Sequence, residues 1–198
     1  MQLLKEITSD EMIGEFLKAE LHSSRFRRGS LRALKMLGYT ESLLENPNYG
    51  DATQNEKRAK VLGLCRGWPD AELFTNFPSD THWYRINFSI NELKRVYRLK
   101  SSSDMADSER SLLATARLVM KGQAVHNINN ELIYEIRKKI EAKEQLPPII
   151  IVAAKQEGRK VLVEGHSRGV AYCSFESLYY DIPAIMGISN DMNDWAYF

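Results

Sequence analysis

The stretch that decides the fold runs from Leu146 to Ile188 and reads LPPIIIVAAKQEGRKVLVEGHSRGVAYCSFESLYYDIPAIMGI. Its apolar run IIIVAA follows two prolines, which end the preceding helix, and is typical of a buried strand. KVLVE and the segment Ile182–Ile188 predict two more strands, and Val170–Leu178 is expected to be helical. Strands that alternate with helices in this way indicate an α/β domain with a mixed α+β sheet.

The residues before this stretch extend the same domain. WYRINFS, which begins at Trp83, alternates as a strand does. Three helices are expected between this strand and the prolines: Ile90–Arg98, Ser108–Lys121 with a cap at Asp107 or Ser108, and Asn130–Lys143.

The first part of the chain is expected to be helical. Thr8 has the capping-box spacing to Glu11 at the start of one helix, and Gly38 is placed to end a second helix. Thr53 and Glu56 repeat the capping-box spacing before a third. We therefore expect a helical N-terminal extension over residues 1–80 and an α/β domain over residues 81–198.

Composition limits the classes of function. The 198 residues carry a net charge of +1, so any binding of a polyanion must come from a local patch. Cys65 and Cys173 form no CxxC pair, and no zinc site or other metal site is expected. The first residues contain no apolar stretch of signal-peptide length, and the longest apolar run, Ile149–Ala154, is too short to cross a bilayer. These features predict a cytoplasmic protein with no membrane partner.

Chemistry is concentrated in the turn EGHSR, which lies between the KVLVE strand and the following helix. A glycine turn at a helix N-terminus attracts anions because the first amides lack helical partners. Gly165, Ser167 and Arg168 are the candidates for phosphate contact, and Glu164 and His166 are the candidates for proton transfer. A structural interpretation stays open, in which Arg168 pairs with Glu164 and Ser167 caps the helix.

The same residues also match G-x-S-x-G, the nucleophile elbow of α/β-hydrolases. That fold needs a histidine after the serine, and no histidine follows Ser167. Only 29 residues follow Gly169, too few for the remaining strands and helices of a hydrolase. A hydrolase is therefore not expected.

The order of LPPIIIV, VLVEGHSRGVAY and DIPAIMGI resembles the ParB/sulfiredoxin superfamily. Members show a proline-led strand and a second strand that ends in an acidic-Gly-x-x-Arg turn. The segments RGWPDAELF and NFPSDTHWYR are more narrowly similar to a group of bacterial proteins of unassigned function. The resemblance implies a nucleotide (ATP, ADP or CTP, with or without Mg²⁺) at the turn, and implies that Arg110 reaches its phosphates.

The superfamily contains several activities, and the turn separates them. Sulfiredoxins use a cysteine where this chain has His166, so sulfiredoxin chemistry is not expected. Free-serine kinases of this fold use an acidic-Gly-His-His-Arg turn, in which Ser167 here replaces the second histidine. The resemblance therefore implies a nucleotide-dependent phosphotransferase or nucleotide hydrolase.

The alternative is a non-enzymatic module of ParB type that binds nucleic acid or responds to a nucleotide. A basic segment supplies its candidate contacts: Arg25, Arg27, Arg28 and Arg32. A solvated helix face explains the same residues without a ligand. A third interpretation is a scaffold whose nucleotide site has decayed.

Overall fold

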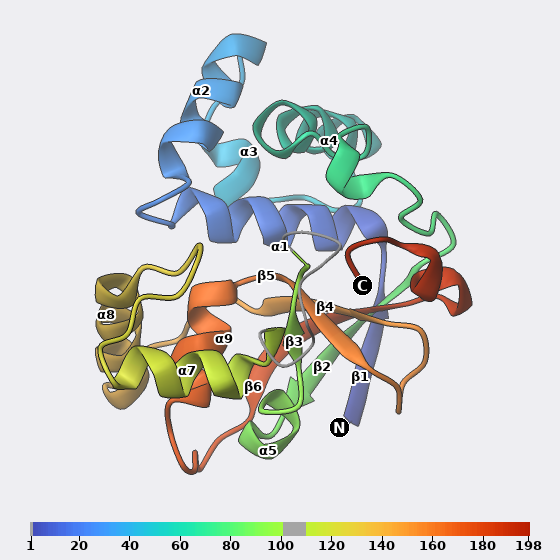
Figure 1. Ribbon diagram of the computed structural model, residues 1–198. Helices are drawn as coiled ribbons and strands as arrows, with labels where there is room; N and C mark the ends of the chain where they lie inside the picture. The colour runs from blue at the N-terminus through green and yellow to red at the C-terminus, as the bar shows by residue number, and fades with distance from the viewer. Residues whose placement is uncertain (1, 101–109) are drawn as a thin grey trace. The chain divides into compact units, whose positions relative to one another are not determined.

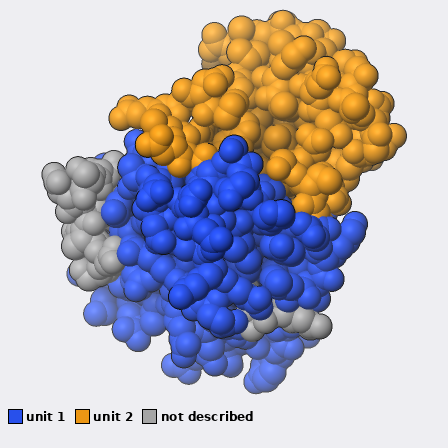
Figure 2. All heavy atoms as spheres, turned by 90° about the vertical axis from the view of Figure 1, so that its right-hand side faces the viewer, with its two compact units in different colours: residues 1–6, 78–198 blue, residues 7–77 orange. Residues whose placement is uncertain are grey.

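The computed structural model describes residues 2–100 and 110–198 and contains two compact units. Residues 7–77 form a helical unit, and residues 1–6 with 78–198 form a unit built on a β-sheet (Figure 2). The change of unit at Pro78 lies close to the expected boundary at residue 80. The first residues differ from the expectation, because strand β1 (Gln2–Ile7) joins the sheet and is not helical.

The helical unit begins with the predicted capping box. Thr8 Oγ1 accepts a hydrogen bond from Glu11 N at 3.1 Å, and the Glu11 carboxylate accepts from Thr8 N. The second helix ends, as expected, at Gly38, which adopts the left-handed conformation with φ +71°. The unit contains α1 (Ser9–Leu21), α2 (Arg27–Leu37), α3 (Ser42–Glu45), α4 (Ala52–Arg66) and the short 3-10 helix η1 (Glu72–Phe74).

The predicted cap at Thr53 is wrong. Helix α4 begins at Ala52, and Asp51 is its N-cap, with Oδ1 accepting from Gln54 N at 3.1 Å. This hydrogen bond lowers the pKa of the Asp51 carboxyl. An aspartate in extended conformation is as good a cap as threonine, and it lies two residues earlier.

Helix α2 is held by its apolar face and by contacts at its start. Ser30, Ala33 and Leu34 are buried where α2 packs on α1 and α4. Just before α2, the Phe26 ring lies 3.7 Å from the Arg66 guanidinium, a cation–π contact, and Arg66 Nε donates to the buried Glu20 carboxylate at 2.9 Å. These contacts fix one face of α2 and leave the opposite face at the surface.

The unit of residues 1–6 and 78–198 is built on a six-stranded mixed sheet, which confirms the expected α/β class (Figure 1). Its strands follow the order β1-β2-β6-β4-β5-β3. β6 pairs antiparallel with β2 and parallel with β4, and β5 pairs antiparallel with β4 and parallel with β3. The bounds of these strands are β2 His82–Phe88, β3 Tyr97–Arg98, β4 Ile149–Ala153, β5 Lys160–Glu164 and β6 Ile182–Ile188.

Helices and the sheet share one apolar core, in which side chains such as Leu112, Ile133 and Val170 pack with Ile151 and Leu162. Every residue of β4 is buried, as expected of a continuous apolar strand at the centre of a sheet. The helices of this unit are α5 (Ile90–Leu93), α7 (Leu112–Met120), α8 (Asn130–Glu141) and α9 (His166–Cys173).

Two helix predictions need correction, and the predicted start of a third helix lies outside the described residues. The helix expected over Ile90–Arg98 stops at Leu93, because Tyr97 and Arg98 pair with β5 as strand β3. The helix expected over Val170–Leu178 begins four residues earlier, at His166, and ends at Cys173. Helix α7 has its N-cap at Ser111, and the predicted caps Asp107 and Ser108 lie outside the described residues.

The pairing register places the ends of four strands at the same end of the sheet, where β4 and β6 begin. Glu164, the last residue of β5, lies opposite Ile150 near the start of β4, and Phe88, the last residue of β2, lies opposite Ile182 at the start of β6. Because β4 and β6 are parallel, all four strand ends lie at the same end of the sheet. The EGHSR turn and the segments around Ser89 and Asp181 therefore lie at this end of the sheet.

Candidate functional site

The turn between β5 and α9 depends on Gly165. Its φ of +89° is left-handed, and a Cβ at this position would lie 2.9 Å from Ile149 Cγ2 and 2.9 Å from Arg168 Nη2. The first helical hydrogen bond follows at once, from Gly169 N to Gly165 O at 2.8 Å. Only glycine meets both demands, a left-handed backbone and a close approach to β4.

Gly169, one helical turn later, allows close packing of the helix. Its backbone is helical, but an added Cβ would lie 2.8 Å from Leu162 Cδ2 and 3.4 Å from Leu112 Cδ1. Helix α9 can therefore lie close against β5 and α7. The two glycines of the G-x-x-x-G pattern fix the place and direction of the helix N-terminus.

Arg168 ties the turn to the neighbouring strand. Its Nη2 lies 3.6 Å from Glu164 Oε1 and donates to Pro148 O at 3.3 Å. The two side chains are 12% and 13% exposed, so the guanidinium is held in place and its side chain is largely enclosed. The predicted structural alternative, an Arg168–Glu164 pair, is thus present, and it positions the guanidinium in the first turn of α9.

The N-terminus of α9 has the features of an anion site. Gly165 has no side chain with which to cap the helix, and the first turn contains no acidic residue. His166 and Ser167 are half-buried beside Arg168. The positive end of the helix dipole and a fixed guanidinium therefore lie together. The Glu164 carboxylate opposes an anion at this place unless it is protonated or a cation joins the site.

A cation here would depend on the ligand. Among the residues that the structure describes, no three His, Cys, Asp or Glu side chains are grouped to hold a metal ion. Glu164 would be one carboxylate ligand, and phosphate oxygens and water would complete the octahedral shell of a Mg²⁺ ion.

The positive φ falls on Gly165, while Ser167 is the second residue of a regular helix. A nucleophile elbow places the strained backbone at the serine itself. The geometry of this turn therefore differs from that of an α/β-hydrolase.

Arg110 is placed in other contacts. Its side chain is fully buried, with Nε donating to Arg98 O at 2.9 Å and Nη2 donating to Phe198 O at 2.7 Å. These bonds join the residues before α7 to the end of β3 and to the C-terminal segment. They account for the burial of Arg110 by protein contacts, and its phosphate contact stays a prediction.

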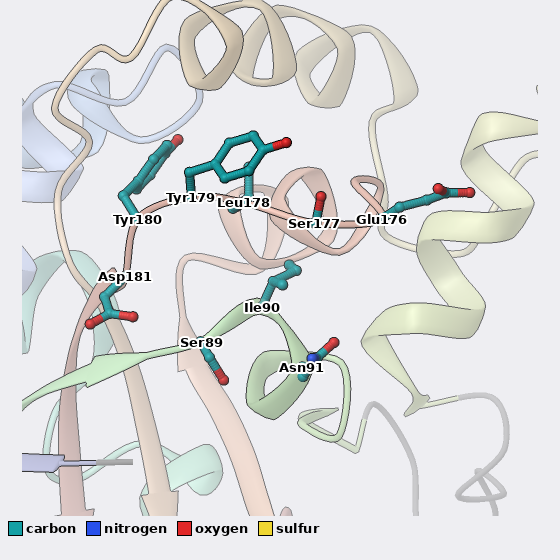
Figure 3. Close-up of a pocket in the computed structure, with 9 residues that line it drawn as sticks. All are labelled: Ser89, Ile90, Asn91, Glu176, Ser177, Leu178, Tyr179, Tyr180 and Asp181. Atoms are coloured by element: carbon teal, nitrogen blue, oxygen red, sulfur yellow. The ribbon is translucent and has the colours of Figure 1, made fainter.

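The sequence did not predict a groove that lies at the same end of the sheet as the turn. Its volume is about 440 Å³. Two segments line it, one at the start of α5 and one between α9 and β6: Ser89, Ile90, Asn91 and Glu176, Ser177, Leu178, Tyr179, Tyr180, Asp181 (Figure 3). Its lining contains carboxylates and hydroxyls but no Lys or Arg, so it favours amine or hydroxyl groups over phosphate. No sequence motif marks it, because loops from two distant segments form it.

Two residues at the end of α9, Tyr172 and Cys173, are buried. Burial raises the pKa of Tyr172 to about 12, Tyr180 adds to the rise, and Arg168 opposes it. Burial also raises the pKa of the Cys173 thiol to about 12, which leaves no thiolate at neutral pH. Helix α9 thus presents no activated cysteine beside the turn.

The aromatic residues of the helical unit pack on each other. The Trp68 ring meets Phe74 and Phe77 edge to face, with ring centroids 4.7 and 5.1 Å apart. This geometry is typical of packing between aromatic side chains.

Comparison with known proteins gives no relative from which a role could be transferred. No family model, no curated protein and no solved structure matches the chain. Within the described part of the chain, no helix has the length and apolar character that spanning a bilayer requires.

Proposed function

We propose that the β5–α9 turn binds the phosphates of a nucleotide, and that the protein is a nucleotide-dependent phosphotransferase or nucleotide hydrolase. One observation carries the proposal: the N-terminus of α9 has glycine as its N-cap and no side-chain cap, and it lies beside the fixed guanidinium of Arg168. The resemblance to the ParB/sulfiredoxin superfamily favours the same site and a nucleotide of the ATP, ADP or CTP kind.

Each residue of the turn has a distinct role in this proposal. Backbone amides at the start of α9 and the Arg168 guanidinium hold phosphate oxygens, and the Ser167 hydroxyl adds a donor. Glu164 pairs with Arg168 in the unliganded protein, and in the complex it holds Mg²⁺ or accepts a proton. In this proposal His166 moves a proton at the phosphate.

Isothermal titration calorimetry with ATP, ADP, CTP and GTP, with and without Mg²⁺, tests the site. Thermal unfolding provides a second readout, because a ligand at 100 times its Kd adds about 2.7 kcal/mol to the stability of the folded state. Arg168→Lys keeps the charge and removes the fork, so we expect its affinity to fall at least roughly tenfold, by the loss of a charged hydrogen bond.

The matched control is Arg117→Lys on α7, an exposed arginine of the same unit, which should leave binding unchanged. Affinity is measured below the unfolding temperature of each variant, so that lost stability is not mistaken for lost binding. The proposal would be overturned if the two variants bound with equal affinity. It would also be overturned if none of the four nucleotides bound to the protein.

Turnover separates the enzyme from the non-enzymatic alternative. Release of phosphate from the bound nucleotide, slowed by His166→Gln without a matching loss of affinity, indicates catalysis. Binding without turnover in the presence of amine and hydroxyl acceptors indicates a nucleotide-responsive module.

A further inference from the structure

Helix α2 carries a row of cations along its outer face. Arg28, Arg32 and Lys35 follow the i, i+4, i+7 spacing that places side chains on one face, and all three are exposed. The first and the last are seven positions apart, which corresponds to about 10 Å along the helix axis. None of the three has a hydrogen bond or ion pair with any residue that the structure describes.

Positive charge is concentrated around this row, although the helical unit as a whole is not basic. Residues 7–77 contain ten basic and ten acidic side chains, but residues 21–40 contain five basic and none acidic. Unpaired like charges four residues apart destabilise a helix slightly. The helical unit therefore holds a positive face that its own folding does not require.

Arg27 does not belong to this face. Its Nη2 lies 3.0 Å from Glu41 Oε2, and its Nη1 donates to Leu21 O at 3.0 Å. The sequence grouped Arg27 with Arg28 and Arg32, whereas the structure assigns it to the junction between α1 and α3. Lys35, in the last turn of α2, completes the row.

We propose that the α2 row, Arg28, Arg32 and Lys35, binds the phosphate backbone of double-stranded nucleic acid. A straight line of unpaired cations on a rigid helix matches a regular line of phosphates. A membrane surface fits less well, because the apolar face of α2 is already buried against α1 and α4. A single strand also fits less well, because the nearby Phe26 ring is covered by the Arg25 and Arg66 guanidiniums and cannot stack on a base.

The experiment measures binding of a fluorescently labelled DNA duplex by anisotropy between 50 and 200 mM NaCl. Three phosphate contacts give a slope of log K against log salt near about −2.7, or an affinity loss of roughly 40-fold over this range. The double variant Arg28→Gln/Arg32→Gln should bind more weakly and show a slope smaller by about 1.8.

The control is Lys138→Gln/Lys139→Gln, which removes the same charge from exposed positions on α8. It should bind the duplex as the unaltered protein does, and circular dichroism should show both variants folded. Equal weakening in the two variants would overturn the proposal, as would no binding at 50 mM NaCl. Tighter binding to poly-glutamate or to anionic phosphatidylserine vesicles than to the duplex, lost in the α2 variant, would also overturn it.

This surface is independent of the nucleotide site. Arg168→Lys should leave duplex binding unchanged, and the α2 variant should leave nucleotide binding unchanged.

Discussion

Helices α9 and α2 both begin without a side-chain cap, and both carry an arginine in the first turn. Arg168 is 12% exposed and contacts Glu164 and the Pro148 carbonyl, whereas Arg28 is exposed and has no described partner. The first arginine is held in a fixed geometry that can select a ligand by shape. The second supplies charge on a mobile side chain, which suits a partner recognised by its phosphates alone. Sequence alone does not distinguish the two, because the difference lies in what surrounds each guanidinium.

The largest effect is expected at the glycine that makes the α9 turn rigid. Gly165→Ala introduces a left-handed alanine and a Cβ 2.9 Å from Ile149 Cγ2, and should cost about 2–4 kcal/mol of stability. Gly122→Ala is the matched control, since Gly122 has φ +73° but nothing within 4 Å of an added Cβ. It should cost only about 1–2 kcal/mol. Urea unfolding of both variants measures the difference, and equal losses would show that close approach to β4 is unimportant.

The two arginines should then differ in their contribution to stability. Arg168→Met leaves the Glu164 carboxylate and the Pro148 carbonyl unpaired and half enclosed, which should cost about 1–3 kcal/mol. Arg28→Met removes a solvated side chain and should change stability by less than about 0.5 kcal/mol. The same urea titration gives both values. A comparable loss in the two variants would remove the distinction between a fixed and a mobile guanidinium.

The sequence predicted the central strands well, but it missed a short strand and misplaced the start of a helix. β5 and β6 have the predicted bounds, because buried apolar runs between turn residues allow little variation. β3 was missed, because two residues such as Tyr97 and Arg98 carry no periodicity and become a strand only by pairing with β5. α9 was placed four residues late, because the left-handed Gly165 allows polar residues to start a helix that the apolar pattern shows only from Val170.

The candidate site shows the same division. The turn and its Arg168–Glu164 pair follow from the local sequence, since the two residues are only four positions apart on either side of the glycine turn. The burial of Arg110 and the groove between Ser89 and Asp181 depend on segments about ninety residues apart. Such contacts are set by the fold and carry no local signal in the chain.

The smallest effect is expected in the pair energies of the two regions. Glu164–Arg168 is the longer pair, at 3.6 Å, but its side chains are 12% and 13% exposed, whereas Arg27–Glu41 is 3.0 Å long and nearly half exposed. Low exposure weakens screening, so a double-mutant cycle should give about 1 kcal/mol for Glu164–Arg168 and about 0.2–0.5 kcal/mol for Arg27–Glu41. In 1 M NaCl the second coupling should nearly vanish, while the first should persist, because the Debye length falls to about 3 Å and acts mainly on exposed charges. Equal salt sensitivity would mean that solvent reaches Arg168 freely, and its guanidinium would then be as mobile as that of Arg28.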